Sequence, residues 1–534
     1  MIRILVTDPL ADEGLKRIEE MDGVEADVKT GLSEDELAAV AGQYDGMIIR
    51  SGVTITDKVL ANPGQLRVIA RAGVGVDNVD LAAATQAGVL VMNTPDANTI
   101  STAEQTLALM LAMSRHVAKA DVHVRSGEWK RKAFVGTQLA AKTLGVVGFG
   151  RVGRAVALRA YAFDMKVVAY DPFFTGDSAL DGKVTMVGSL DEVFAQADYL
   201  TLHTVITDET KGLINSKTIG KMKDGVRIVN CARGGLINEA DLAAALESGK
   251  VAAAAVDVYS AEPPGADNPL LKAPNIVLAP HLGASTEEAQ LAVTVDAVDA
   301  LLDYLVNDRI RWAVNVTGLP AQMTQRDRAY MDLAQRMGTI LSKLCTGGIK
   351  SVSVVTHDES LDNLAKVLCK QVLVDLLSPH LTTRLNLINV DDIAKARGIT
   401  VGLSTDTSKT GLAESLLARV ETREGTHEIV GEVFQDGRPR IMALDGYQMN
   451  LEPEGGMVLI FNNDEPGVIG LVGKAFGEAK INIADLTLSH REKTAKKVLK
   501  IDGPRPDAVI DNLRGQKPQI LEVLPIRLPP ILKS

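Results

Sequence analysis

The chain has 534 residues, which at about 150 residues per domain corresponds to three or four domains and excludes a small disulfide-stabilised scaffold. Lys and Arg total 57 against 68 Asp and Glu, and the resulting net charge of -11 disfavours nucleic acids and anionic membrane surfaces as partners. Hydrophobic residues make up 46% and charged residues 23%, which is ordinary for a globular protein, and no apolar run reaches the roughly 18 residues that could span a membrane.

The three cysteines, Cys231, Cys345 and Cys369, are odd in number and widely spaced, so they predict no disulfide framework. The first residues, Met1 to Asp8, resemble a strand and lack the basic and apolar regions of a signal peptide. We therefore expect a protein of a reducing compartment, the cytoplasm.

The N-terminal part alternates short apolar runs with amphipathic stretches. One helix is expected to begin at Ser33, because Glu36 stands three residues later in a capping-box arrangement. The runs that resemble strands are Ile2 to Val6, Gly46 to Ile49, Leu66 to Ala70 and Val89 to Met92. This alternation predicts a parallel sheet with helices on both faces.

A second α/β series begins with a long apolar helix pattern from Ser101 to Ala118, and turn-rich stretches from Asn315 to Pro320 and from Leu451 to Gly456 resemble linkers. The fold class expected is two doubly wound parallel-sheet α/β domains followed by an α+β domain and a small α+β module. The expected domains are a substrate domain (1–97, completed by 285–316), a dinucleotide domain (98–284), a third domain (318–455) and a C-terminal module (456–534).

The strongest local motif is the glycine fingerprint formed by Gly148, Gly150 and Gly153, with a strand pattern before it and a helix pattern after it. The first glycine permits a tight turn, the second lets backbone amides approach a pyrophosphate, and the third lets helix and strand pack closely. The next strand pattern ends in Asp171, whose carboxylate would accept hydrogen bonds from ribose hydroxyls and repel a 2′-phosphate. The sequence therefore predicts a bound dinucleotide, NAD rather than NADP.

Three later apolar runs end in polar residues, and in a parallel sheet such residues gather at the carboxyl edge where ligands bind. Arg233, Glu262 and His281 could converge there. An imidazole can take a hydroxyl proton as hydride leaves, a carboxylate can orient the imidazole, and a guanidinium can hold a carboxylate. This set suits oxidation of a 2-hydroxy acid.

The motifs at 230–235 (NCARGG), 257–264 (DVYSAEPP) and 279–286 (APHLGAST) are more specific than the glycine fingerprint. They resemble those of the D-2-hydroxyacid dehydrogenase family, in particular its long-form phosphoglycerate dehydrogenases, over nearly the whole chain. The resemblance implies that His281 is the acid/base, that Glu262 is its partner and that Arg233 holds the carboxylate and carbonyl oxygens. The further cofactor contacts that it implies are Val74, Arg151, Val152, Thr204, Cys231, Ala232, Asp257, Gly283 and Ala284, together with Arg233 and His281.

One departure from the family is Val205, which stands where proline usually follows the threonine. It puts the expected contact of Thr204 with the cofactor in question.

For the substrate, glycine amides would bind a carboxylate and paired arginines a phosphate. The expected substrate contacts are Arg50, Ser51, Arg71, Gly73, Val74, Gly75, Arg131, Arg233 and His281. In the family, an arginine like Arg131 reaches in from a neighbouring subunit, and the region 98–142 makes the dimer contact. The resemblance thus implies a homo-oligomer, a dimer or a tetramer, although a surface salt bridge is the alternative role of each arginine.

The third domain resembles the intervening domain of the long-form enzymes, in which Arg438, Arg440 and Lys409 could hold an anion or be surface charges. The C-terminal module resembles an ACT domain, an amino-acid-sensing βαββαβ unit. By that resemblance Asn462 and Asp464, with Asn482 of the paired subunit, would bind an effector, L-serine being the usual one in the family. A purely structural dimerisation module is the alternative.

The other histidines show no ligand spacing, so no metal site is expected. The basic run from Lys493 to Lys500 is interpreted as a solvated face rather than as a site for a polyanion.

The resemblance implies NAD-dependent oxidation of 3-phospho-D-glycerate to 3-phosphohydroxypyruvate, the entry into serine synthesis, with L-serine as a feedback effector. Two alternatives remain. One is another enzyme of the same fold, such as a hydroxypyruvate or glyoxylate reductase. The other is an NAD-sensing binding protein, because a fold does not fix a function.

Overall fold

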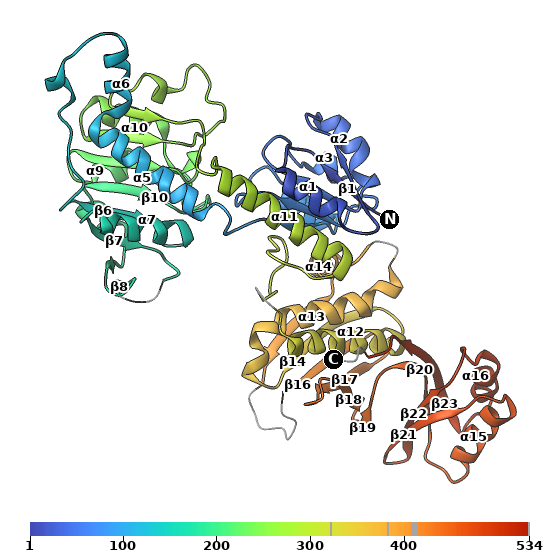
Figure 1. Ribbon diagram of the computed structural model, residues 1–534. Helices are drawn as coiled ribbons and strands as arrows, with labels where there is room; N and C mark the ends of the chain where they lie inside the picture. Colours follow the sequence, from blue (N-terminus) through green and yellow to red (C-terminus); the bar gives the residue numbers. More distant parts are fainter. Residues whose placement is uncertain (175, 177, 321–322, 382–383, 407–413, 532–534) are drawn as a thin grey trace.

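The computed structural model describes residues 1–174, 176, 178–320, 323–381, 384–406 and 414–531. Four sheets follow one another along this part of the chain, and Figure 1 shows the dinucleotide domain standing apart from the other three. No helix in these ranges is long and apolar enough to cross a membrane.

The first sheet is parallel throughout and has the strand order β2-β1-β3-β4-β5, as the alternating pattern predicted. Its strands are β1 (Ile2–Val6), β2 (Val24–Val28), β3 (Gly46–Ile49), β4 (Val68–Arg71) and β5 (Leu90–Met92). Its helices are α1 (Asp12–Glu19), α2 (Glu34–Val40), α3 (Asp57–Leu60) and α4 (Leu81–Gln86). The capping box of Ser33 and Glu36 is present at the start of α2. Two apolar clusters cover the sheet, and one of them includes helix α11 (Glu287–Asn307), which returns from the second domain.

The second sheet has the order β13-β12-β11-β10-β6-β7-β9-β8 and is parallel except for β8. Its strands are β6 (Thr143–Val147), β7 (Lys166–Tyr170), β8 (Ser178–Ala179), β9 (Val184–Met186), β10 (Tyr199–Leu202), β11 (Val226–Asn230), β12 (Val251–Val256) and β13 (Ile276–Leu278). Its helices are α5 (Thr99–Arg115), α6 (Val117–Arg125), α7 (Arg151–Ala162), α8 (Leu190–Gln196), α9 (Ser216–Gly220) and α10 (Glu239–Glu247). The strand order reverses at β6, which is where ligands bind in doubly wound sheets.

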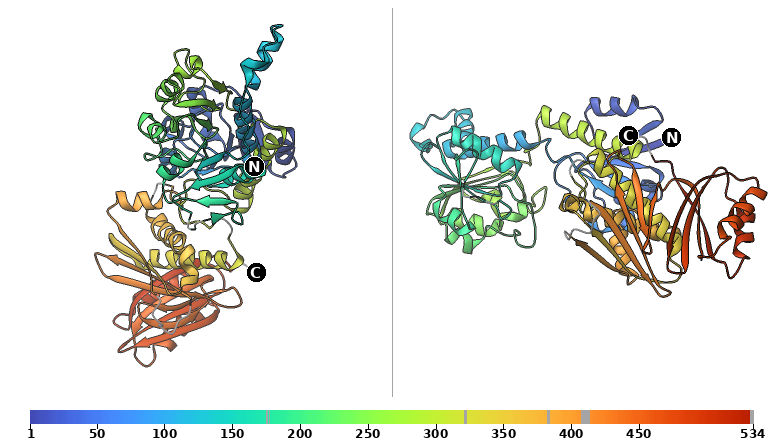
Figure 2. Two further views of the ribbon diagram at one scale, coloured as in Figure 1. Left: turned by 90° about the vertical axis from the view of Figure 1, so that its left-hand side faces the viewer. Right: turned by 90° about the horizontal axis from the view of Figure 1, so that it is seen from below.

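The single helix expected from Ser101 to Ala118 is two helices. His116 adopts a left-handed conformation with φ of 56°, so the chain turns between α5 and α6. Figures 1 and 2 show α6 extending away from its sheet, and none of its residues is buried.

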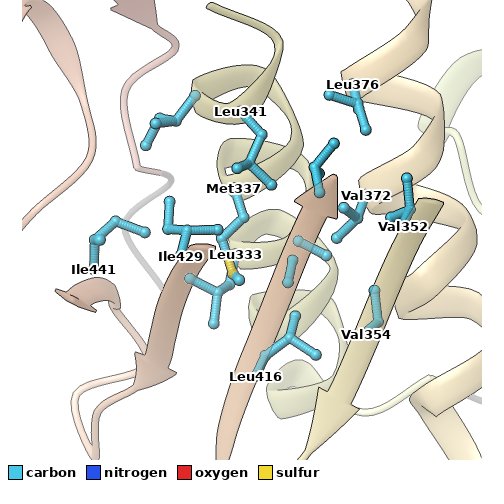
Figure 3. Close-up of a cluster of buried hydrophobic side chains, with 14 of the residues drawn as sticks. Leu333, Met337, Leu341, Val352, Val354, Val372, Leu376, Leu416, Ile429 and Ile441 are labelled. Carbon is cyan, nitrogen blue, oxygen red and sulfur yellow. The ribbon is translucent and has the colours of Figure 1, made fainter. Parts of the chain in front are cut away.

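The third sheet has the order β15-β14-β16-β17-β18-β19. Its strands are β14 (Ile349–Thr356), β15 (Thr400–Thr405), β16 (Ser415–Thr422), β17 (Thr426–Val433), β18 (Pro439–Leu444) and β19 (Tyr447–Leu451). Its helices are α12 (Gln325–Leu344), α13 (Asp362–Leu377) and α14 (Val390–Ala396). Figure 3 shows side chains of α12 and α13 packing on those of β14, β16, β17 and β18, with Met337 and Leu416 among them.

The C-terminal module has the element order predicted for it, β20-α15-β21-β22-α16-β23, and the strand order β21-β22-β20-β23. Its elements are β20 (Gly455–Asn463), α15 (Val468–Glu478), β21 (Ile483–Arg491), β22 (Thr494–Ile501), α16 (Asp507–Arg514) and β23 (Ile520–Leu528). The linker expected from Leu451 to Gly456 is shorter, because β19 ends at Leu451 and β20 begins at Gly455.

The third domain and the C-terminal module share one hydrophobic core, in which Met457 and Ile526 pack with residues of α12 and β17. The buried Arg336 of α12 ties the two together, because its guanidinium donates to the carbonyls of Pro453 and Pro529, each at 2.7 Å.

The interpretation of Lys493 to Lys500 as a solvated face is wrong. Lys496 and Lys497 are only 7% and 2% exposed, and each ammonium group has a hydrogen-bond partner. The ammonium of Lys496 donates to Asp445 of the third domain and lies over the ring of Tyr447, and that of Lys497 donates to Asn462 at 2.5 Å.

The third domain also contacts the first sheet through the segment before α14. Arg384 donates to the carbonyl of Leu66 and Asn386 to that of Gly88, each at 2.8 Å. These carbonyls precede β4 and β5, so the third domain contacts the amino ends of these two strands. The carboxyl end of β4 leads to the expected substrate loop, and that of β5 leads to α5.

Candidate active site

The three fingerprint glycines have three different surroundings, and these fit the roles predicted for them. Gly148 has φ of 89°, and a Cβ there would lie 2.6 Å from the carbonyl oxygen of His203. A Cβ on Gly153 would lie 2.2 Å from the carbonyl oxygen of Gly148, so helix α7 could not approach β6 as closely. A Cβ on Gly150 would meet no atom within 4 Å, so the start of α7 faces open space. A dinucleotide pyrophosphate fits this space, because the free N–H groups of a helix start favour an anion.

Asp171 lies at the end of β7, next to the glycine turn. Its carboxylate accepts the backbone N–H groups of Phe149 at 2.8 Å and Phe173 at 2.9 Å. These bonds fix the carboxylate and leave further lone pairs for ribose hydroxyls. Arg151, the first residue of α7, pairs with Asp96 in the segment that enters α5.

The imidazole of His281 and the carboxylate of Glu262 form a direct pair. Nδ1 of His281 lies 2.6 Å from Oε2 of Glu262, and Oε1 accepts the backbone N–H of Tyr259 at 2.9 Å. Because a carboxylate only accepts hydrogen bonds, Nδ1 carries the hydrogen and Nε2 is free to accept a proton. The His281 side chain is 50% exposed, so Nε2 is open to a ligand.

Asp257, which is expected beside the nicotinamide, also shapes the turn that carries His281. It is fully buried, and its two carboxylate oxygens accept the backbone N–H groups of Leu282 and Gly283, each at 2.9 Å. His281 donates its own N–H to the Asp257 carbonyl at 2.8 Å. Asp257 therefore holds the turn that presents His281, and its expected contact with the cofactor stays a prediction.

Arg233 follows β11 in a turn that Asn230 shapes by accepting the N–H of Ala232 and donating to the carbonyl of Arg233. Nε of Arg233 donates to Asp77, in the loop after β4, at 2.8 Å. A Cβ on Gly75 would lie 1.9 Å from the Arg233 guanidinium, so only glycine allows this approach.

Arg71 lies at the carboxyl end of β4, with a buried Nε that has no hydrogen-bond partner within the described residues. Burial, and then the positive charges of Arg233 and Arg50, lower the pKa of Arg71 to about 10. Arg233 and Arg50 thus both act electrostatically on Arg71, while the carboxylates of Asp77 and Asp8 partly offset their charge. Such a concentration of guanidinium groups favours an anion beside Arg71. The position of the Arg71 side chain requires glycine at Gly73, since a Cβ there would lie 1.6 Å from the Arg71 guanidinium.

Arg50 is fixed from two sides. Its backbone N–H donates to the buried Asp8 at 2.9 Å, and its guanidinium donates to the side chain of Gln290 on α11. Gln290 in turn donates to the carbonyl of Ala284 at 2.6 Å, so it connects Arg50 to the turn that follows His281.

The remaining expected contacts lie around this centre or away from it. Thr204 follows β10 beside Gly148, and the Val74 carbonyl accepts a hydrogen bond from Asn93 at 2.6 Å. Burial raises the pKa of Cys231 to about 12, so that residue offers backbone and no thiolate. Arg131 begins a short turn that follows α6 in the chain, and it is exposed. Ser51 is exposed, and Val152 and Ala232 are partly buried.

The expected effector site takes Asn482 from a paired subunit, so one chain contains only Asn462 and Asp464 of it. Asn462 is fully buried and donates to the carbonyl of Asn463 at 2.5 Å while its oxygen accepts from Lys497, so the structure corrects its expected ligand contact. Asp464 is exposed, and the side chain of Asn482 donates to Asp502 at 2.6 Å.

Arg438 and Arg440, for which an anion site or a surface charge was expected, form ion pairs within the chain. Both pair with Glu452, at 3.1 and 2.8 Å, so their charge is already compensated. Lys409 lies outside the described residues.

Four positioning residues were not predicted: Asp77, Gln290, Asn230 and Asp8. Three of them bind an expected site residue far away in the sequence, and no local pattern reports such a contact.

Comparisons with known proteins agree with this architecture. Residues 107–283 match the family described as the NAD-binding domain of D-isomer specific 2-hydroxyacid dehydrogenases. Residues 327–445 match the D-3-phosphoglycerate dehydrogenase intervening domain. The crystal structure of a glyoxylate reductase from Paecilomyes thermophila matches with a TM-score of 0.54 and 32% identity, covering 59% of this chain and 98% of that one. The class is therefore that of the NAD-binding 2-hydroxyacid dehydrogenases, and NAD is the cofactor that the glycine turn serves.

Relatives that match over the full length narrow the class. The D-3-phosphoglycerate dehydrogenase of Synechocystis sp. is 39% identical over 96% of this chain and 92% of its own. That of Methanocaldococcus jannaschii is 39% identical over 99% of this chain and all of its own. The chain belongs to the D-3-phosphoglycerate dehydrogenase family.

Proposed function

We propose that the chain catalyses NAD-dependent oxidation of 3-phospho-D-glycerate to 3-phosphohydroxypyruvate, the first step of L-serine synthesis. The observation that carries this proposal is that Arg50 and Arg71 stand at the carboxyl ends of the neighbouring strands β3 and β4. Arg233 reaches the loop after β4 through Asp77, and Gln290 joins Arg50 to the turn after His281. A substrate with a carboxylate at one end and a phosphate at the other matches such a set of guanidinium groups.

In this proposal, Nε2 of His281 takes the proton of the substrate hydroxyl, and Glu262 holds the ring and stabilises the imidazolium that forms. Arg233 exchanges part of its contact with Asp77 for the substrate carboxylate and the developing carbonyl oxygen. Arg50 and Arg71 hold the phosphate, with Arg131 of a neighbouring subunit as a further candidate. NAD, when bound, supplies the acceptor for the hydride that leaves C2 of the substrate.

The principal alternative enzyme is a glyoxylate or hydroxypyruvate reductase. The reductase structure with which the chain aligns covers only 59% of it, so that similarity leaves the third domain and the C-terminal module unexplained. The match of residues 327–445 to the intervening domain favours the phosphoglycerate reaction.

The alternative of an NAD-sensing protein without activity is tested by adding 3-phospho-D-glycerate and NAD to the purified chain and following NADH absorbance. The proposal expects NADH to form with the wild type and to be nearly absent with His281→Ala. If both proteins bind NAD and neither reduces it, the NAD-sensing alternative replaces the enzyme.

We further propose that the chain forms a homodimer or tetramer. The arm around α6 supports this, because Val122, Trp129 and Val135 are 67%, 76% and 79% exposed, and apolar side chains at such density favour an interface. The number of subunits is measured by light scattering.

Feedback by L-serine at the C-terminal module belongs to the same proposal. Its support is the βαββαβ order of an ACT domain and the exposed Asp464, which can accept the ammonium group of an amino acid. Asn482 of a second subunit would complete the site once its bond to Asp502 is exchanged.

The three free, buried cysteines support a reducing compartment, and we propose the cytoplasm.

A further inference from the structure

A hollow of about 450 Å³ lies where the last turn of α12 meets the sheet of the C-terminal module. It is bounded by Lys343 of α12, by the ends of β20, β22 and β23, and by the loop 503–506. Ligand pockets commonly measure roughly 300–1,000 Å³ and occur preferentially between domains, so this hollow has the size and the place of a site for a small molecule.

The charged side chains that bound the hollow are all cationic: Lys343, Arg505 and Arg527. Arg505 is held in place by Asp507, whose carboxylate lies 2.6 Å from its Nε. Arg527 reaches only a carbonyl, that of Gly503 at 3.4 Å, and among the residues that the structure describes neither it nor Lys343 has a recorded ion pair. In a chain of net charge -11, this is a local concentration of positive charge in which only Arg505 has a counter-ion among the described residues.

The floor of the hollow is apolar and its wall is rigid. Met457, Ile501 and Ile526 are buried beneath it. Pro504 and Pro506 fix the backbone of the loop on either side of Arg505 and supply no N–H groups. Recognition of a ligand therefore depends on the three cationic side chains and the apolar floor, and the fixed loop lowers the entropic cost of binding.

We propose that this hollow binds an organic anion, with its anionic group between Lys343 and Arg527 and its apolar part on the floor. A zwitterionic amino acid does not fit, because no acidic residue bounds the hollow to accept an ammonium group. The hollow is also distinct from the proposed serine site. It adjoins Gly456 at the start of β20, whereas Asp464 follows the end of that strand, roughly 25 Å away at 3.3 Å per residue.

Hydrogen exchange of the full chain, saturated with NAD, tests this site with three probes that share a phenyl ring: phenyl phosphate, phenol and L-phenylalanine. The expected result is that phenyl phosphate slows exchange in residues 499–503 and 523–528, whereas phenol and L-phenylalanine do not. Equal protection by all three probes would overturn the anion preference. Protection by phenyl phosphate only around residues 71–77 would overturn the site, because the probe would then bind the arginine group of the active site alone.

The double variant Lys343→Gln/Arg527→Gln is expected to weaken this local protection by phenyl phosphate about tenfold or more, because two charge-assisted contacts are lost. Both side chains are exposed, so folding is expected to be unaffected. The matched control is Lys474→Gln, which removes an exposed lysine on α15 and should leave protection unchanged. Wild-type protection in the double variant, or equal loss in the control, would overturn the proposal.

Discussion

The guanidinium of Arg233 donates to Asp77 at 2.8 Å, although the two residues belong to different sheets. The turn after β11 and the loop after β4 therefore meet at this pair. Gly75 in this loop has no Cβ, and any Cβ there would overlap the Arg233 guanidinium. The glycine therefore allows Arg233 to reach Asp77. The pair marks a place where the second domain and the first sheet meet, beside the substrate site that we propose.

Replacement of His281 by alanine is expected to lower kcat by a factor of about 10²–10⁴, the usual contribution of a general base. The affinity for NAD should not change. Steady-state rates and calorimetric titration with NAD measure the two effects separately. Glu262→Gln should lower kcat less than His281→Ala does. The amide oxygen of the glutamine can still accept a hydrogen bond from the His281 ring, although the negative charge is lost. Unchanged turnover in His281→Ala would remove the residue from the acid/base role.

Alanine at Gly150 should reduce NAD affinity, whereas alanine at Gly153 should reduce stability. Gly150 has φ of -73° and open space around its Cβ position, so Gly150→Ala should keep its melting temperature and lose NAD affinity, because the methyl group occupies the pyrophosphate space. Gly153→Ala should lower the melting temperature even without NAD, since its Cβ overlaps a carbonyl oxygen. Thermal melts with and without NAD separate the two outcomes. Full NAD affinity in Gly150→Ala would contradict the position of the cofactor.

Asp375 on α13 predicts a pH dependence of stability. Burial raises its pKa from 3.8 to about 6, so the folded protein holds this proton more tightly than the unfolded chain and loses stability as pH rises through that interval. At pH 7 the ionised carboxylate costs roughly 3 kcal/mol. Asp375→Asn keeps an acceptor for Gln371 and should raise the melting temperature at pH 7, with a smaller gain at pH 5.

The exposed Asp392 provides the control for this prediction, because Asp392→Asn should change stability equally little at both pH values. A gain in Asp375→Asn that does not depend on pH would show that the carboxylate is not the cause.

Asp464→Ala should abolish any inhibition by L-serine and leave the uninhibited rate unchanged, because the residue lies in the C-terminal module and outside the active site. The neighbouring Glu465→Ala is the control and should retain the response. Inhibition of the Asp464 variant at wild-type serine concentrations would exclude the proposed effector site.

Much of the α/β part could be predicted from the sequence, because its signals are local. The strands Ile2–Val6 and Gly46–Ile49 have the predicted bounds, and Gly148 and Gly153 have the turn and close packing that their spacing indicated. His281 and Glu262 also meet as expected, since both follow neighbouring strands of one parallel sheet.

What could not be predicted depends on contacts between distant parts of the chain. The bond between Arg50 and Gln290 joins residues 240 positions apart, and only the return of α11 to the first sheet creates it. Lys496 looked solvated because its partner, Asp445, belongs to another domain. Asp257 was recognised as part of a motif, but its burial beneath the His281 turn depends on the tertiary structure.

The central claim is most directly tested by following NADH oxidation with 3-phosphohydroxypyruvate and with hydroxypyruvate, for the wild type and for Arg71→Gln. The account predicts that the wild type prefers the phosphorylated acid in kcat/KM by at least about tenfold, the effect of one charge-assisted contact. It also predicts that Arg71→Gln loses most of this preference while still reducing hydroxypyruvate. Equal kcat/KM values for the two acids in the wild type, or a preference for hydroxypyruvate, would contradict it and leave a general 2-keto acid reductase.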